Sequence, residues 1–187
     1  PIFNFYAPLT YYIIEIFRLL TGDGMWALKL TYLLFWLAAV LGMYRLASDA
    51  VDPDGALVAA TAYGVAPYLL VDLYVRNGIA EFACFGVLPW LLFGLWRTTA
   101  RQGRFSPLVT ALAYAALILI RNITALIVSP FLGLFLLLTA VDRRTFVRGA
   151  AALGLGLLLA AFFWLPALAE TKYVHAVSSL TGGFFQF

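Results

Sequence analysis

"FSPLVTALAYAALILIRNITALIVSPFLGLFLLLTAV" (residues 105–141) is an apolar stretch in which charge occurs only once, at Arg121. A single helix over these residues would be about 55 Å long, whereas the hydrocarbon core of a bilayer is about 30 Å thick. It would also hold Arg121 near the middle of the membrane, at a cost of roughly 3 kcal/mol. A hairpin of two helices, over 105–120 and 125–141, avoids both problems. The stretch therefore predicts two helices that meet at a turn containing Arg121 and Asn122.

The composition of the whole chain agrees with a membrane location. Of its 187 residues, 64% are hydrophobic and only 11% are charged, whereas a soluble domain is about half apolar and about a quarter charged. No basic run with interleaved aromatic residues suggests nucleic-acid binding, and the single cysteine, Cys84, cannot form an internal disulfide. We therefore expect an integral membrane protein whose first partner is the lipid bilayer.

Four further apolar runs are long enough, or nearly long enough, to cross a membrane, for which about 20 residues are needed. They cover residues 26–47, 55–71, 79–96 and 147–165, and Pro166 is expected to stop the last one. With the hairpin, the predicted fold is all-α and polytopic, with six transmembrane helices. The chain begins at Pro1 rather than Met, and we expect it to be a piece of a longer protein.

The arginines between these runs predict the orientation. Cytoplasmic loops carry an excess of Lys and Arg, and six alternating helices place the most basic connections on one side. These connections hold Arg45, Arg97, Arg101, Arg104, Arg143, Arg144 and Arg148. That side is therefore expected to be cytoplasmic, in the inner (plasma) membrane of the cell. Residues 72–78, the Arg121 turn and the segment after Pro166 then face outwards.

The segment before the first long run predicts a different kind of helix. Residues 6–20 place apolar side chains on one side of a helix and polar ones on the other, with Glu15 and Arg18 paired at i,i+3. This pattern is typical of a helix that lies in the membrane interface. The apolar side holds Leu9, Tyr12, Ile13, Ile16, Phe17 and Leu20, and the polar side holds Thr10, Tyr11, Glu15 and Arg18.

Four ionisable residues fall on the predicted outer side, at the ends of apolar runs: Asp72, Arg76, Glu81 and Arg121. Each arm of the hairpin is only about 24 Å long, so its turn should lie slightly below the surface, where a turning backbone must face protein or a wet cavity. The four residues are therefore either ordinary interfacial charges or the lining of an outer cavity. Two arginines suit a phosphate, and a nearby carboxylate could act as a base or as a metal ligand.

Other site chemistries have little support. His175 is the only histidine, so a histidine-based zinc site within this chain is not expected, and we assign no metal ligand. Ser178 and Ser179 have no partner base at a recognisable spacing. Lys172 and His175 are interpreted as interfacial charges, and Glu170 as part of the external rim of the outer cavity.

Four motifs, in this order and at these spacings, resemble a known family: "FNFYAPLTYYI" (3–13), "PYLLVDLYVRNGIAEF" (67–82), "LIRNITAL" (119–126) and "FFWLPALAE" (162–170). They are similar to the bacterial multi-span proteins of the 6-pyruvoyl-tetrahydropterin synthase-related membrane domain family. That family in turn resembles the GT-C class of glycosyltransferases, which use polyprenyl-phosphate-linked sugars.

The resemblance implies a GT-C-like fold in which residues 6–20 correspond to a juxtamembrane helix. It also implies that the catalytic acid, and the ligands of any divalent metal, lie on a first external loop before Pro1. No catalytic residue can therefore be named here. The family often has His followed by Asn where this chain has Arg121 and Asn122, which favours a contact with an anion at this position.

The expected function is transfer of a sugar from a polyprenyl-phosphate donor on the extracytoplasmic face. The donor phosphate would lie near Asp72, Arg76, Glu81, Arg121 and Asn122. One alternative is a non-catalytic accessory or scaffold subunit of a larger membrane complex, which is the better interpretation if the arginines pair only with Asp72 and Glu81. A transporter is a third possibility and predicts broken helices aimed at a site in the middle of the membrane.

Overall fold

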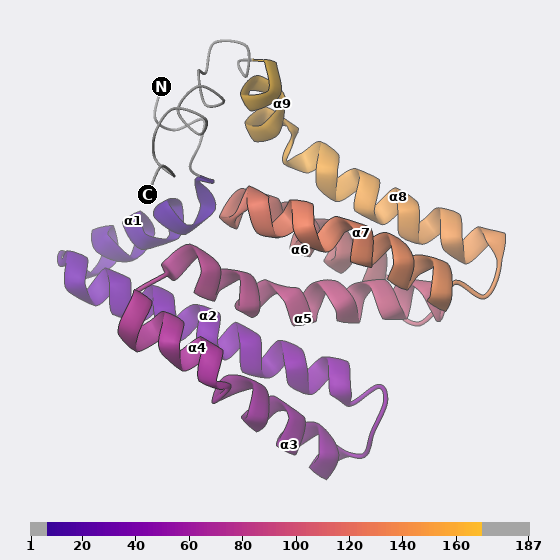
Figure 1. Ribbon diagram of the computed structural model, residues 1–187, viewed down its shortest axis with the longest axis horizontal. Coiled ribbons are helices and arrows are strands. Elements are labelled where there is room, and N and C mark those ends of the chain that lie inside the picture. Colours follow the sequence, from indigo (N-terminus) through magenta and orange to yellow (C-terminus); the bar gives the residue numbers. More distant parts are fainter. Residues whose placement is uncertain (1–6, 170–187) are drawn as a thin grey trace, which may run out of the picture.

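The computed structural model describes residues 7–169, and within them every regular element is a helix. Figure 1 shows long helices lying side by side, with short helices at their ends. The elements are α1 (Leu9–Thr21), α2 (Gly24–Ala47), α3 (Pro53–Gly64), α4 (Pro67–Val71), the π-helix η2 (Asp72–Arg76), α5 (Ile79–Thr99), α6 (Ser106–Ile120), α7 (Asn122–Thr139), α8 (Arg143–Leu159) and α9 (Ala161–Ala169).

Within the described residues, four helical segments are long and apolar enough to cross a membrane: α2, α3 to η2 taken together, α5 and α7. A fifth is reached if α8 and α9 form one bent span. The remaining apolar helix, α6, has 15 residues, or about 22 Å of length, which is shorter than the bilayer core. The all-helical membrane fold is confirmed, while the number of six spans stays a prediction.

The long helices approach one another through glycines. A Cβ atom added at Gly86 of α5 would come within 2.8 Å of the Phe35 carbonyl oxygen of α2, and one at Gly156 of α8 within 2.6 Å of the Ala111 carbonyl oxygen of α6. Small residues at such contacts let helix backbones pack closely, which matters within lipid because the hydrophobic effect does not drive helix association there. Helix α5 thereby packs between α2 and α6, and α6 packs against α8 (Figure 1).

The apolar stretch from 105 to 141 is broken at Arg121. Helix α6 ends at Ile120, α7 begins at Asn122, and Arg121 between them has an extended backbone with φ −158° and ψ 101°. The hydroxyl groups of Tyr114 in α6 and Ser129 in α7 lie 2.7 Å apart. These two residues are almost equally far from Arg121 along the chain, so the two helices run back along each other as a hairpin.

Where an unbroken helix is expected over 55–71, the structure has an interruption between α3 and α4. Pro67 has no N–H to continue the hydrogen-bond ladder and disfavours a helical conformation at the residue before it; Ala66 accordingly has ψ 133°. The Gly64 carbonyl at the end of α3 accepts a hydrogen bond of 2.9 Å from the indole Nε1 of Trp36. An indole from α2 thus satisfies a carbonyl that the break leaves free.

The helix expected over 147–165 is also divided. The chain bends by 67° between α8 and α9, and Pro166 lies inside α9, so the helix continues past the residue that is expected to stop it. The indole Nε1 of Trp164 donates to the Leu157 carbonyl at 2.9 Å, close to the bend. This bond satisfies a carbonyl in the last turn of α8, where intrahelical partners end.

Helix α1 has 13 residues, which is too short to cross a membrane. The expected assignment of Thr10 to the polar side is wrong, because Thr10 is fully buried. Helix α1 packs against α2, α5 and α6, so protein covers part of the side that is expected to be polar. Glu15 and Arg18 do lie on the exposed side and form an ion pair of 2.6 Å. The hydrogen bond from Arg18 lowers the pKa of the Glu15 carboxyl below its usual value.

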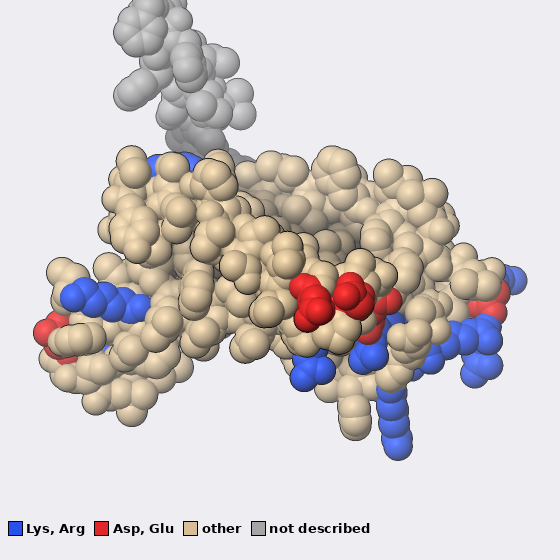
Figure 2. Space-filling view, turned by 90° about the horizontal axis from the view of Figure 1, so that it is seen from below, with Lys and Arg blue, Asp and Glu red and all other residues tan. Residues whose placement is uncertain are grey.

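Figure 2 shows one small group of charged side chains at the left of the view and a larger group that extends from its middle to its right edge, with an uncharged surface between the two groups. At one end of the bundle, Arg97 in the last turn of α5 pairs with Asp49 in the connection between α2 and α3 at 3.0 Å, and Arg101 in the connection between α5 and α6 pairs with Asp142. This end holds the connections that are predicted to be cytoplasmic.

Candidate functional site at the outer end of the bundle

The connection between α4 and α5 positions the candidate site. Within η2 the helix widens to a π-turn, and the Asn77 N–H donates to the Asp72 carbonyl. Asn77 then takes the left-handed conformation, with φ 50°, and the Gly78 N–H also reaches the Asp72 carbonyl, at 3.1 Å. Asn and Gly are the residues that tolerate such a reversal best. The turn thus directs the chain from η2 into α5. Asp72 and Arg76 precede the turn, and Glu81 follows it.

Asp72 and Arg76 lie one helical turn apart on the same face. Nη1 of Arg76 donates to Oδ1 of Asp72 at 3.0 Å, and the Asp72 side chain is completely buried. The second oxygen, Oδ2, has no hydrogen-bond partner among the described residues. A buried carboxylate is costly unless it is paired, so Arg76 is the group that compensates Asp72.

Glu81 in the first turn of α5 joins both arginines. Its Oε2 accepts from Nη2 of Arg76 at 3.2 Å and also from Nη1 of Arg121. Its other oxygen, Oε1, accepts a hydrogen bond of 2.5 Å from the Tyr68 hydroxyl, which in turn accepts from Nη1 of Arg76 at 2.8 Å. One carboxylate oxygen therefore holds two guanidinium groups from different parts of the chain. We call Tyr68, Asp72, Arg76, Glu81 and Arg121 the outer cluster, after the side of the membrane that the sequence predicts for them.

Of the expected site residues, Asn122 is not part of the outer cluster, and Glu170 cannot be compared with it. The Asn122 side chain is exposed and accepts a hydrogen bond from the neighbouring Ile123 N–H at 2.9 Å. It has no hydrogen bond to the outer cluster within the described part of the chain. Glu170, expected at the external rim, lies outside the described residues, as do Lys172 and His175.

Sequence reasoning missed three residues around this site. Tyr68 lies four residues before Asp72, so helical spacing alone could have placed it on the same face. Asn77 precedes Gly78, a dipeptide that marks a turn. Tyr32 donates a hydrogen bond of 2.7 Å to Oδ1 of Asn77 and anchors the turn to α2, but no local pattern points to that contact.

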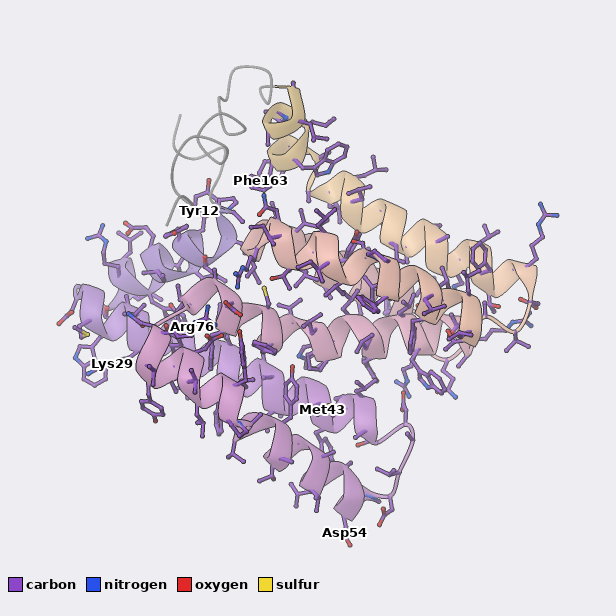
Figure 3. All side chains as sticks on the ribbon, viewed as in Figure 1. Tyr12, Lys29, Met43, Asp54, Arg76 and Phe163 are labelled. Carbon is purple, nitrogen blue, oxygen red and sulfur yellow. The ribbon has the colours of Figure 1, made fainter. Side chains whose placement is uncertain are left out.

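An apolar groove lies next to the outer cluster. Its volume is about 420 Å³, and its walls come from α2, from the break between α3 and α4, from α4 and η2, and from the first turn of α5. Leu73 and Tyr74 of η2 line the groove, as does Tyr32, whereas Asp72 and Arg76 of the same segment belong to the outer cluster. Figure 3 places Lys29, another lining residue, at the same end of the bundle as Arg76.

A family model for a membrane protein domain, the 6-pyruvoyl-tetrahydropterin synthase related domain, matches residues 3–181. The chain belongs to this family. No curated protein matches it, and no solved structure matches it.

In this member of the 6-pyruvoyl-tetrahydropterin synthase related family, the outer cluster has two cations and two carboxylates. Within residues 7–169, no group of three or more His, Cys, Asp or Glu side chains could hold a metal ion. The cluster is partly open to its surroundings: the side chain of Arg76 is 48% exposed and that of Arg121 is 33% exposed. Chemically, the site can offer guanidinium N–H groups to an anion, and Glu81 fixes where those groups point.

Proposed function

We propose that this domain binds the phosphate of a polyprenyl-phosphate-linked sugar on the extracytoplasmic face, as part of a membrane glycosyltransferase. The observation that carries the proposal is the sharing of Oε2 of Glu81 by Arg76 and Arg121. Two guanidinium groups held at one atom lie close enough to contact a single phosphate together.

Unused hydrogen-bond donors on both arginines support this function. A guanidinium group has five N–H donors. Within the described residues, Arg76 uses its two Nη1 hydrogens on Tyr68 and Asp72 and one Nη2 hydrogen on Glu81. Arg121 contacts Glu81 through Nη1 alone. The remaining donors belong to partly exposed side chains, and guanidinium groups match the geometry of phosphate oxygens.

The apolar groove supports a lipid-linked ligand rather than a soluble one. It borders η2, the segment that carries Asp72 and Arg76, and its lining is almost entirely apolar apart from Lys29, the Trp36 indole and tyrosine hydroxyls. A polyprenyl chain could lie in this groove while its phosphate contacts Arg76 and Arg121. We therefore assign the groove to the chain and the outer cluster to the phosphate.

A second candidate function, a non-catalytic subunit of a larger membrane complex, is favoured by a different observation. Arg76 and Arg121 already pair with Asp72 and Glu81, so the four side chains form a closed network whose formal charges cancel. In this alternative the outer cluster only stabilises the turn between η2 and α5 and the hairpin at Arg121.

Binding of a long-chain polyprenyl phosphate to the purified full-length protein distinguishes the two candidates. Native mass spectrometry would compare the wild type with Arg76→Gln and Arg121→Gln, using the uncharged polyprenol as a second ligand. Arg18→Gln is the matched control, because Arg18 is also an ion-paired arginine but lies on α1, away from the cluster.

If the proposal is right, each cluster variant binds the polyprenyl phosphate about tenfold more weakly, and Arg18→Gln binds it like the wild type. Polyprenol binding should be weak in every variant. Equal binding of the phosphate by all four proteins, or equally tight binding of polyprenol, would reject phosphate recognition and leave the non-catalytic subunit as the better interpretation.

A further inference from the structure

A polar cavity lies at the opposite end of the bundle, where the outer cluster plays no part. Its volume is about 300 Å³, and it is lined by Arg101, Arg144, Thr145 and Arg148. Arg101 belongs to the connection between α5 and α6, and the other three belong to the first turns of α8. We call this cavity the inner arginine pocket, because its connections are predicted to face the cytoplasm.

Among the described residues, only one of the three arginines in the pocket has an acidic partner. Arg101 pairs with Asp142, and Asp142 is fixed as the N-cap of α8, where Oδ1 accepts from the Thr145 N–H at 2.8 Å. Arg144 and Arg148 form no ion pair with any other described residue. Three cations therefore surround the cavity with a single carboxylate, which leaves an excess of two positive charges.

The position of these two arginines on α8 is unfavourable without an anion. Arg144 and Arg148 are spaced at i,i+4, and like charges at this spacing repel each other on a helix. Arg144 also lies in the first turn, where the helix dipole disfavours cations. The first turn itself contains no acidic residue, and the Asp142 carboxylate at the N-cap already pairs with Arg101. An anion in the pocket would remove both penalties at once.

The general excess of arginine on cytoplasmic loops does not account for this arrangement. Arg97, at the same end, pairs with Asp49 at 3.0 Å, so acids are available to neutralise arginines there. The pocket differs because its cations enclose a cavity and lack such partners. Its surroundings also match a lipid: Val141 is 85% exposed and Val147 is 55% exposed, and Val147 follows Arg144 at i+3, on an adjoining side of α8.

We propose that the inner arginine pocket binds the phosphate of an anionic phospholipid from the surrounding leaflet. The phosphate would contact Arg144 and Arg148, Arg101 would close the cavity from the neighbouring connection, and the acyl chains would pass over Val141 and Val147. Basic pockets at the cytoplasmic ends of transmembrane helices favour anionic headgroups in this way. This site is independent of the outer cluster and of the function proposed for it.

The test uses the purified full-length protein, with bound phosphatidylglycerol and phosphatidylcholine counted by native mass spectrometry. The variant Arg144→Gln/Arg148→Gln removes two charges from the pocket. The control Arg45→Gln/Arg104→Gln removes one charge from the last turn of α2 and one from the connection between α5 and α6, at the same end of the bundle, and neither residue lines the pocket. A parallel titration with inorganic phosphate asks whether a soluble anion displaces the lipid.

We expect the pocket variant to bind phosphatidylglycerol about 30-fold more weakly than the wild type, while the control variant and phosphatidylcholine binding stay unchanged. Equal loss in the pocket and control variants would overturn the proposal, because it would show attraction to net charge alone. Displacement of phosphatidylglycerol by inorganic phosphate at similar concentrations would assign the pocket to a soluble phosphate and overturn the lipid assignment.

Discussion

Replacing Glu81 by Gln removes the charge that holds Arg76 and Arg121 together, while the size of the side chain stays the same. In the wild type, Oε2 of Glu81 accepts from both guanidinium groups. In Glu81→Gln the two cations stay close together, and the amide at their centre carries no charge. The variant therefore loses two ion pairs and gains a repulsion between the arginines.

The size of the effect follows from the partial burial of the pair. Exposed ion pairs contribute about 0.2–1 kcal/mol, whereas removing one partner of a buried pair costs about 3–5 kcal/mol. The Glu81 side chain is 19% exposed and that of Arg121 is 33% exposed. The pair is therefore neither fully exposed nor fully buried, and its contribution should lie between these two energies. We expect the Glu81–Arg121 interaction to contribute about 1–2 kcal/mol, and its loss to lower the apparent Tm by about 2–8 °C.

The assay is a double-mutant cycle on thermal unfolding in a single detergent, with Glu81→Gln, Arg121→Gln and the double variant. Because the single variants remove the same interaction, the double variant should be more stable than the sum of the two single losses predicts, by about 1–2 kcal/mol. Glu15→Gln is the control: Glu15 also pairs with an arginine, but its side chain is 50% exposed, so little change is expected.

Two results would refute this reasoning. Additive losses in the cycle would mean that Glu81 and Arg121 do not depend on each other. A loss in Glu15→Gln as large as that in Glu81→Gln would mean that partial burial does not set the strength of these pairs.

Two further substitutions test the packing and the turn, each with a control at a neighbouring position or with a second replacement. Gly156→Ala should lower the free energy of unfolding by about 1–3 kcal/mol, because its Cβ would lie 2.6 Å from a backbone carbonyl oxygen of α6. Gly154→Ala on the same helix is the control, since its Cβ would meet nothing within 4 Å and the variant should be neutral or stabilising. Equal melting temperatures of the two variants would contradict the close approach of α8 to α6. Asn77→Ala should be about 1 kcal/mol less stable than Asn77→Gly, because both variants lose the hydrogen bond from Tyr32 but only glycine adopts φ 50° without strain. Chemical unfolding of the two variants measures this difference directly. An alanine variant as stable as the glycine variant would count against the left-handed turn.

The helices are largely predictable because the signals that form them are local. A run of about 20 apolar residues is sufficient to indicate a spanning helix, and the single charge at Arg121 is sufficient to predict where one apolar stretch divides. The interruption before Pro67 is also a local signal, because proline cannot continue the hydrogen-bond ladder of a helix. The bend between α8 and α9 has no comparable signal, since Pro166 lies beyond the bend.

The outer cluster was predictable only in part. The spacing of Asp72 and Arg76 places them on one helical face, and the charge bias of the connections predicts that Glu81 and Arg121 lie on the same side of the membrane. Neither rule gives a distance between Glu81 and Arg121. Their contact depends on how α5 packs against the hairpin of α6 and α7, which is a tertiary property that sequence spacing does not encode.

The arginines at the two ends of the bundle differ in whether carboxylates pair with them, which a count of arginines does not reveal. At the end that is predicted to face outwards, Arg76 and Arg121 face two carboxylates, and what remains for a ligand is a set of unused N–H groups whose direction Glu81 fixes. At the end that is predicted to face the cytoplasm, Arg144 and Arg148 lack acidic partners among the described residues, and what remains is net charge around a cavity. The first arrangement favours recognition by directed hydrogen bonds and the second favours attraction by charge. Salt should therefore weaken lipid binding at the inner pocket more than ligand binding at the outer cluster, because screening acts most strongly on exposed and uncompensated charges.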